Sequence, residues 1–212
     1  MATINQGILG GFSGKIGNVA ASTWRGKNVL RSAPRKSTKP ISAAQQRQRD
    51  KFKCVLQFLT PLKGILTETF GANVGSKTPF NHAMSYHMKE AVIHTPTGFT
   101  MEYAKVLVAM GGLCGLENSV VQSATAHSLQ ITWQDNSTQG LAYPTDAFLV
   151  VAYAPSIHSF EYFKGNSLRE TEQAILNFTA PFYGETVHLW ASFTNNNKAL
   201  TATSRYLGAF VI

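Results

Sequence analysis

Cysteine, acidic residues and long apolar runs are all scarce in this chain of 212 residues. Its two cysteines, Cys54 and Cys114, are too few for a disulfide scaffold and lack CxxC spacing, so we expect small apolar thiols in a reducing compartment. The longest apolar run, residues 106–116, has about half the length of a membrane span. The N-terminus lacks the basic region of a secretory signal. We therefore expect synthesis in the cytoplasm without a signal peptide; a final place in an extracellular or virion-like assembly stays open.

The scarcity of acids is not uniform along the chain. Residues 1–100 contain fourteen Lys and Arg against three acids, a net charge of +11, and no acid precedes Asp50. Residues 101–212 contain five Lys and Arg against eight acids, a net charge of −3. This asymmetry indicates that two physically different parts are joined in one chain. A hydrophobic content of 44% excludes global disorder.

Residues 1–40 lack the composition of a packed domain. Six of the seventeen glycines lie at or before position 26, among serines and basic residues. Residues 16–24 and 28–33 have strand-forming composition, and Arg25-Gly26-Lys27 between them suits a tight turn. A glycine-rich hairpin is marginal in water by itself, so this arm needs something to pair with. Residues 34–40 form a basic linker bounded by prolines.

Helical signals fill residues 41–96. Ser42-Ala-Ala-Gln45 is a capping box, and apolar residues recur at three- and four-residue steps from there to Phe70. Pro61 is expected to kink or split this helix. A second helix is predicted from Thr78-Pro79 to about Ile93, and the two helices should pack as a hairpin.

Residues 97–212 have the sequence pattern of short strands separated by turns. The predicted strands cover 101–110, 119–123, 128–133, 147–154, 159–163, 172–178, 186–194 and 200–211. The last seven match a Greek-key sandwich. The predicted fold class is therefore α+β: an extended N-terminal β-arm or hairpin (1–40), a central helical hairpin (41–96) and a C-terminal seven-stranded antiparallel β-sandwich (97–212).

The strands around Trp133 resemble those of a fibronectin type III-like or immunoglobulin-like module. In such modules a Trp on the second strand packs under the third and sixth strands. The resemblance places Trp133 there, with Tyr153 and Trp190 nearby. The chain has no cysteine pair between the two expected sheets, which argues against the antibody type.

The N-terminal half contains four distinctive motifs: Gly7-Ile-Leu-Gly-Gly-Phe-Ser-Gly-Lys-Ile-Gly17, Trp24-Arg-Gly-Lys, Arg31-Ser-Ala-Pro-Arg-Lys and Ala44-Gln…Gln48-Arg-Asp-Lys-Phe52. With these motifs the chain resembles an uncharacterised family of Gram-negative bacterial proteins. The family shares this glycine-rich signature, a helical middle and a β-rich end, and is known only as a domain of unknown function. It therefore implies no active site. Similar openings in small phage-encoded proteins hint at a particle or filament component.

Motifs for nucleotides and metals are incomplete. The glycines of residues 7–17 neither follow a strand nor open a helix, and they lack the Walker pattern. His82 and His87 lie five residues apart, on different faces of a helix, without the acid of an HExxH motif. We expect them to be surface or boundary histidines, and we expect no cofactor and no metal.

Catalytic and ligand-binding groupings are equally weak. Asp135, Asp146 and His188 could form a triad only on paper, since Asp135 has a turn context and His188 an outward strand position. A glycan platform of Trp133, Trp190 and Tyr206 conflicts with the alternation that turns both tryptophans inward. We therefore predict a protein that is not an enzyme and has no evident small-molecule substrate.

The arm is the strongest functional candidate, because it combines apolar and basic residues without a core. The candidate subunit contacts are Ile8, Leu9, Phe12, Ile16, Val19, Trp24, Val29 and Leu30. The candidate basic contacts are Lys15, Arg25, Lys27, Arg31, Arg35, Lys36, Arg47 and Arg49. Nucleic acid, solvent alone and an acidic surface on a neighbouring copy are the three open partners for the charge.

Two functions follow from this arm. We favour a structural subunit that self-assembles into a homo-oligomeric filament, tube or virion-like particle, with the arm inserting into or pairing with a neighbour. The alternative is a nucleic-acid-binding accessory protein that uses the basic N-terminal half.

Overall fold

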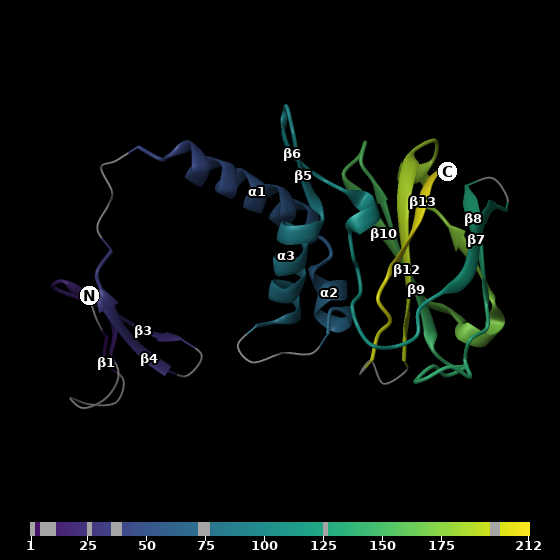
Figure 1. Ribbon diagram of the computed structural model, residues 1–212, viewed down its shortest axis with the longest axis horizontal. Coiled ribbons are helices and arrows are strands. Elements are labelled where there is room, and N and C mark those ends of the chain that lie inside the picture. The colour runs from purple at the N-terminus through teal and green to yellow at the C-terminus, as the bar shows by residue number, and fades with distance from the viewer. Residues whose placement is uncertain are drawn as a thin grey trace. The chain divides into compact units, whose positions relative to one another are not determined.

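The computed structural model describes residues 3–4, 12–24, 27–34, 40–71, 77–124, 127–195 and 200–212 (Figure 1). The chain divides into two compact units, residues 1–46 and residues 47–212, which are described separately. Helices and antiparallel sheets are both present, which confirms the α+β class.

The first unit contains a four-stranded antiparallel sheet in the order β1-β2-β3-β4. Its strands are β1 (Thr3–Ile4), β2 (Phe12–Ile16), β3 (Val19–Trp24) and β4 (Lys27–Ser32). Residues 16–24, predicted as one strand, are divided by a turn at Gly17, whose φ of 55° is a left-handed conformation open to glycine. The predicted turn at Arg25-Gly26 and the basic linker at 35–39 lie outside the described residues.

Three helices form the central region. In α1 (Ala43–Leu59), Ser42 Oγ accepts from the Gln45 N–H at 3.3 Å and Gln45 Oε1 accepts from the Ser42 N–H at 3.2 Å, which confirms the capping box. Pro61 separates α1 from α2 (Lys63–Thr69), so the predicted split is confirmed. The third helix, α3 (Pro79–Glu90), is capped by Thr78, whose Oγ1 accepts from the Asn81 N–H.

The rest of the second unit is mainly antiparallel sheet. A short hairpin joins β5 (Val92–Thr95) to β6 (Gly98–Met101). One sheet has the order β11-β8-β7, formed by Gln173–Asn177, Ser128–Gln134 and Glu117–Ser123. The other has the order β10-β9-β12-β13, formed by Ser159–Leu168, Ala147–Ala154, Thr186–Thr194 and Arg205–Val211. Short 3₁₀ turns lie at Tyr103–Lys105 (η1), Arg169–Thr171 (η2) and Ala180–Phe182 (η3).

The strand predicted for residues 101–110 is wrong. Only Met101 belongs to a strand, and the chain then continues through η1 into an extended connection. The Leu107 N–H donates to His87 Nε2 at 3.2 Å, and the Val108 N–H donates to Ser204 Oγ at 2.9 Å. Side chains therefore satisfy backbone groups that a neighbouring strand would otherwise pair.

The β10-β9-β12-β13 sheet is covered on both faces, as the second unit in Figure 1 shows. One face packs on the β11-β8-β7 sheet around Trp133, Val150 and Leu189. The opposite face packs on α1, α2 and α3 through Val151, Tyr153 and Trp190, among others. Alternate residues of each strand point to opposite faces, so neighbours in the sequence enter different cores.

This arrangement corrects the expected surroundings of Trp133. Tyr153 and Trp190 do not lie beside it between the two sheets, because both belong to the core under the helices. The neighbours of Trp133 are instead Phe148, at 4.3 Å between ring centroids, and Phe193, at 5.7 Å. The sequence places Trp190 correctly in the interior but on the wrong face of its strand.

Candidate interaction surface on the N-terminal sheet

The β1–β4 sheet divides its side chains between two chemically different faces. Ile16 pairs with Val19, and Ala21 pairs with Leu30, so these four side chains share one face. Ile16 is 52% exposed, Val19 42% and Leu30 64%, while Ala21 is 7% exposed. None of the other described positions on this face, Gly14, Thr23, Asn28 and Ser32, is charged. We call it the apolar face.

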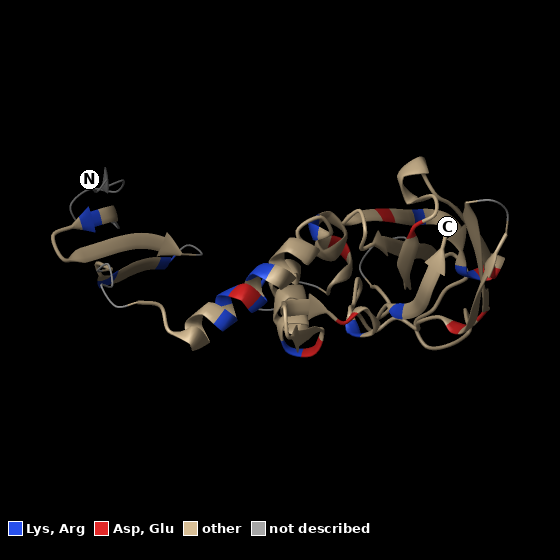
Figure 2. Ribbon diagram, turned by 90° about the horizontal axis from the view of Figure 1, so that it is seen from above, with Lys and Arg blue, Asp and Glu red and all other residues tan. Residues whose placement is uncertain are grey.

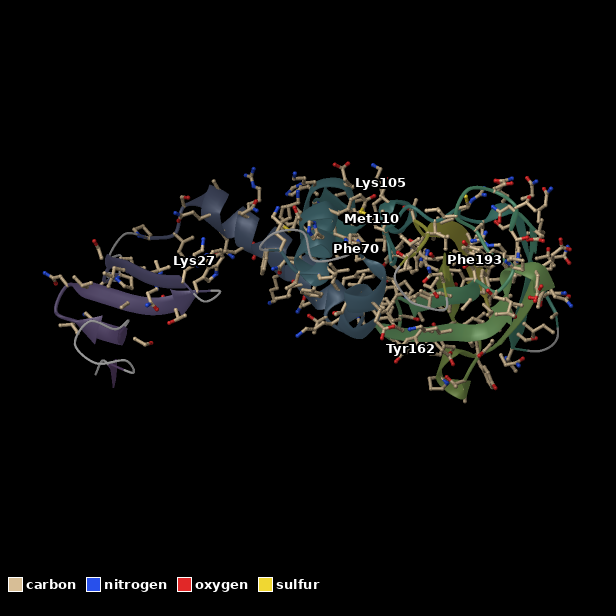
Figure 3. The ribbon with its side chains drawn as sticks, turned by 90° about the horizontal axis from the view of Figure 1, so that it is seen from below. Lys27, Phe70, Lys105, Met110, Tyr162 and Phe193 are labelled. Carbon is tan, nitrogen blue, oxygen red and sulfur yellow. The ribbon has the colours of Figure 1, made fainter. Side chains whose placement is uncertain are left out.

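The opposite face carries the positive charge of the sheet. Lys15 pairs with Ala20, which pairs with Arg31, and Trp24 pairs with Lys27 at the end of the hairpin. All three cations are exposed, as are Trp24 and Val29. Figure 2 shows Lys and Arg on these strands without an acid, and Figure 3 labels Lys27. We call it the basic face.

The two predicted sets of arm residues are therefore mixed between the faces. Trp24 and Val29, predicted as subunit contacts, lie with the cations, while Ile16, Val19 and Leu30 lie apart from them. Arg47 and Arg49 are exposed on the first turns of α1. Phe12 has its backbone in β2. Ile8, Leu9, Arg25, Arg35 and Lys36 lie outside the described residues.

The structure does not bring Asp135, Asp146 and His188 together as a catalytic triad, because each binds a different partner. Asp135 Oδ1 accepts from the Ser137 N–H at 2.9 Å, which confirms the turn predicted for Asp135. The Asp146 carboxylate binds Arg169. His188 lies half-buried on the face of β12 turned to the helices, with Nδ1 2.7 Å from the Tyr206 hydroxyl. Burial lowers the pKa of His188.

The aromatic residues considered as a glycan platform lie on opposite faces of the β10-β9-β12-β13 sheet. Trp133 lies in one core, and Trp190 lies in the other with its ring 5.7 Å from that of Tyr206. Trp190 Nε1 donates to the Tyr103 carbonyl at 3.0 Å. Burial raises the pKa of the nearby Cys54 thiol, which reduces its thiolate fraction and its nucleophilicity.

His87 is a structural residue, and its predicted surface or boundary position is wrong. Its side chain is fully buried on α3. Nε2 accepts from the Leu107 N–H, which leaves the proton on Nδ1 to donate to the Ala83 carbonyl at 2.7 Å. Burial lowers the pKa of His87 from 6.5 to about 4. The neutral ring thus ties α3 to the connection that follows η1.

This lowered pKa predicts a loss of stability in acid. The folded state binds the His87 proton only near pH 4, whereas the unfolded chain binds it near pH 6.5. The contribution of the neutral ring is fully present above pH 6.5 and is lost as the pH falls towards 4. We expect a decrease of about 2–3 kcal/mol between pH 7.5 and 4.5. Urea unfolding at both pH values measures it.

The control for this prediction is a second histidine. His87→Gln should flatten the pH dependence, while His94→Gln, at an exposed position of β5, should leave it unchanged. An equal pH dependence in wild type and His87→Gln would show that another group is responsible.

Arg169 is fully buried, which no local pattern in the sequence indicates. Its Nε lies 3.1 Å from Asp146 Oδ2, Nη1 donates to Asn136 Oδ1, and Nη2 donates to the Cys114 carbonyl at 2.9 Å. The guanidinium carbon lies 3.9 Å from the centroid of Phe193, which Figure 3 labels. An arginine between Leu168 and Glu170 carries no pattern that distinguishes it from a surface residue.

Two further findings concern the described residues alone. No group of three or more His, Cys, Asp or Glu side chains among them is placed to hold a metal ion. Their helices are all too short or too polar to cross a bilayer.

The comparisons with solved structures return fibronectin type III domains. One from human collagen alpha-1(XX) is 14% identical, with a TM-score of 0.34 over 48% of this chain and 87% of that one. One from human contactin 1 is 8% identical, with a TM-score of 0.33 over 48% and 76%. The FN5 domain of Drosophila Lar is 8% identical, with a TM-score of 0.32 over 45% of this chain and 90% of that one. Each of these similarities covers about half of this chain.

The remaining comparisons concern sequence. No curated protein matches the chain. A family model matches residues 11–208, which include most of the glycine-rich N-terminal motif, the helices and the strands. By this match the chain belongs to DUF6266, a family of unknown function, in agreement with the resemblance that its N-terminal motifs carry.

Proposed function

We propose that this protein is a non-enzymatic structural subunit that self-assembles through its N-terminal arm. The arm pairs with or inserts into a neighbouring subunit, and the seven strands β7–β13 form a fibronectin type III-like sandwich as the body. The product is a filament, a tube or a virion-like particle. One observation carries this proposal: Ile16, Val19 and Leu30 are exposed on a sheet in which Ala21 is the one buried residue among positions 13–24 and 27–32, the part of the sheet whose burial the structure describes.

The energetics of a small sheet support a partner. A sheet without a packed face is marginal in water, because its ordering cost is not offset by apolar burial. Burying an exposed aliphatic side chain contributes about 1.5–3 kcal/mol, so three of them supply several kcal/mol to an association. The apolar face thus has the composition of an interface core rather than of a solvated surface.

The charge distribution supports electrostatic attraction between the arm of one copy and the body of another. The sheet of the first unit carries cations, whereas residues 101–212 carry a net charge of −3, so the two parts have opposite signs of charge. In that half, Asp135, Glu170 and Glu172 are exposed near one end of the β11-β8-β7 sheet, where the Asp135 N–H donates to Glu172 Oε1 at 3.2 Å. Opposite charges on two copies raise the association rate at low salt.

The basic face also favours the second candidate, a nucleic-acid-binding accessory protein. Lys15, Lys27 and Arg31 lie on one face together with the exposed Trp24. Cations contact phosphates and an aromatic ring stacks on bases, and such binding weakens steeply with salt.

Light scattering and electron microscopy of the purified full-length protein, free of nucleic acid, distinguish the candidates. Self-assembly predicts oligomers whose size increases with protein concentration. The accessory role predicts a monomer that shifts single-stranded DNA at 50 mM salt, with the shift lost in Lys15→Glu/Arg31→Glu. A monomer at every concentration, with or without DNA, contradicts the self-assembly proposal.

A further inference from the structure

The apolar face contains two rows of side chains that run across strands β2, β3 and β4. In each row the size of the side chain changes steadily from β2 to β4. The first row, from β2 to β4, consists of Gly14, Ala21 and Leu30, and the second consists of Ile16, Val19 and Ser32. The rows thus have their large ends on opposite sides of β3, on β4 and on β2.

This size pattern is self-complementary under a two-fold rotation about an axis parallel to β3. Such a rotation places β4 of one copy over β2 of the other and keeps β3 over β3. Leu30 then lies over Gly14 of the second copy, and Ile16 lies over its Ser32. Large side chains opposite small ones fill the space between two packed sheets without clashes. A two-fold axis also gives each copy the same contact, as in most homodimers.

The charges agree with this choice of face. The basic face, with Lys15, Lys27 and Arg31, points away from the second copy when the apolar faces meet. Two packed sheets lie about 10 Å apart, so the cations of the two copies stay in solvent on the outer sides. Pairing through the basic faces would bring six cations together and desolvate them.

We propose that the partner of the N-terminal sheet is the same sheet of a second copy, packed apolar face to apolar face about a two-fold axis along β3. This inference rests on the proposed self-assembly and names the contact through which it occurs. The pairing joins two copies, and a longer assembly needs a second contact between bodies.

Cysteine cross-linking tests the face and the axis together. In full-length protein carrying Cys54→Ser and Cys114→Ser, Ala21→Cys places two thiols opposite each other across the axis. The two thiols point towards each other between sheets whose backbones lie about 10 Å apart, so a bifunctional thiol reagent with a short spacer of about 5 Å should give a covalent dimer in high yield. The matched control is Ala20→Cys, the neighbouring alanine on the basic face. Equal yields from both variants would overturn the assignment of the face.

A second pair of variants distinguishes this inference from the wider proposal. Leu30→Asp should raise the dissociation constant of the assembly at least about 100-fold, because it buries a carboxylate at the contact. Val29→Asp, on the same strand but the basic face, should change it less than about threefold. Differently tagged wild-type and Leu30→Asp chains should also fail to co-purify.

Each outcome of the tagging experiment has one meaning. If wild-type protein captures the Leu30→Asp chain as well as another wild-type chain, the arm binds the body of its neighbour. The face-to-face contact is then wrong, while self-assembly through the arm stands. If wild-type protein is monomeric at all concentrations, both proposals fail.

Discussion

Replacing Asp146 with alanine should lower the free energy of unfolding by about 3–5 kcal/mol, because it leaves the charge of Arg169 buried without its carboxylate. The exposed fraction is 0% for the Arg169 side chain and 1% for that of Asp146. Asn136 and the Cys114 carbonyl accept further hydrogen bonds from the guanidinium, but neither carries a negative charge. The loss should therefore exceed that of a single neutral hydrogen bond.

Chemical denaturation followed by circular dichroism measures this loss. The matched control is Lys164→Ala, which removes the exposed ion pair between Lys164 and Glu68 and should cost less than about 1 kcal/mol. Asp146→Asn keeps the size of the side chain but removes its charge, so it should still show most of the loss in free energy of unfolding expected for Asp146→Ala. If Asp146→Ala were no more costly than Lys164→Ala, the guanidinium would have to be hydrated in the folded protein.

The consequence of this network is a fixed geometry at one end of the body. The Arg169 N–H also donates to the Asp146 carbonyl at 2.9 Å, and Trp133 Nε1 donates to the Arg169 carbonyl at 2.8 Å. Strand β8 of one sheet is thereby tied to the turn that follows β10 of the other.

Local signals in the sequence were sufficient where one interaction decides the structure. The bounds of β9 and β12 agree with the predicted strands 147–154 and 186–194. Residues 148–154 are a nearly continuous apolar run, and Val187, Leu189 and Ala191 alternate with other residues in β12, so both patterns indicate a strand. Ser42 with Gln45 fixed the start of α1, and Pro61 its end. At both ends of α1, residues close in the sequence carry the whole interaction.

The interactions that local patterns missed join residues far apart in the chain. Residues 106–110 have the composition of a strand, but Ser204 and His87 bind their backbone instead. The buried position of Arg169 depends on Asp146 and Asn136, which lie more than twenty residues away. No periodicity within a segment contains this information.

The register of the strands in the arm also could not be predicted from local patterns. Its composition predicted apolar and basic contacts without a core, but not their separation onto two faces. That separation depends on the pairing of Ala21 with Leu30, and a shift of one residue would exchange the faces of one strand. Only the turn at Gly17, which divides residues 16–24, establishes the alignment of β2 with β3.

Trp190→Ala tests whether the helices and the sheets form one folding unit. Trp190 is fully buried, and its Nε1 binds the Tyr103 carbonyl, so its removal leaves a cavity and an unpaired acceptor. We expect a loss of about 3–5 kcal/mol in the free energy of unfolding. The matched control is Trp24→Ala in the arm, at a side chain that is 57% exposed, where we expect a change within about 0.5 kcal/mol.

The shape of the transition decides the question. Because α1, α2 and α3 share a core with β9 and β12, the helical signal at 222 nm and the Trp fluorescence should disappear together, in wild type and in Trp190→Ala. A helical region that folds by itself over residues 41–96 would instead unfold at a separate midpoint, and Trp190→Ala would shift the two transitions unequally. One shared midpoint means that the helices and the sandwich unfold in a single cooperative transition. A partner that binds the folded form of either part then stabilises both.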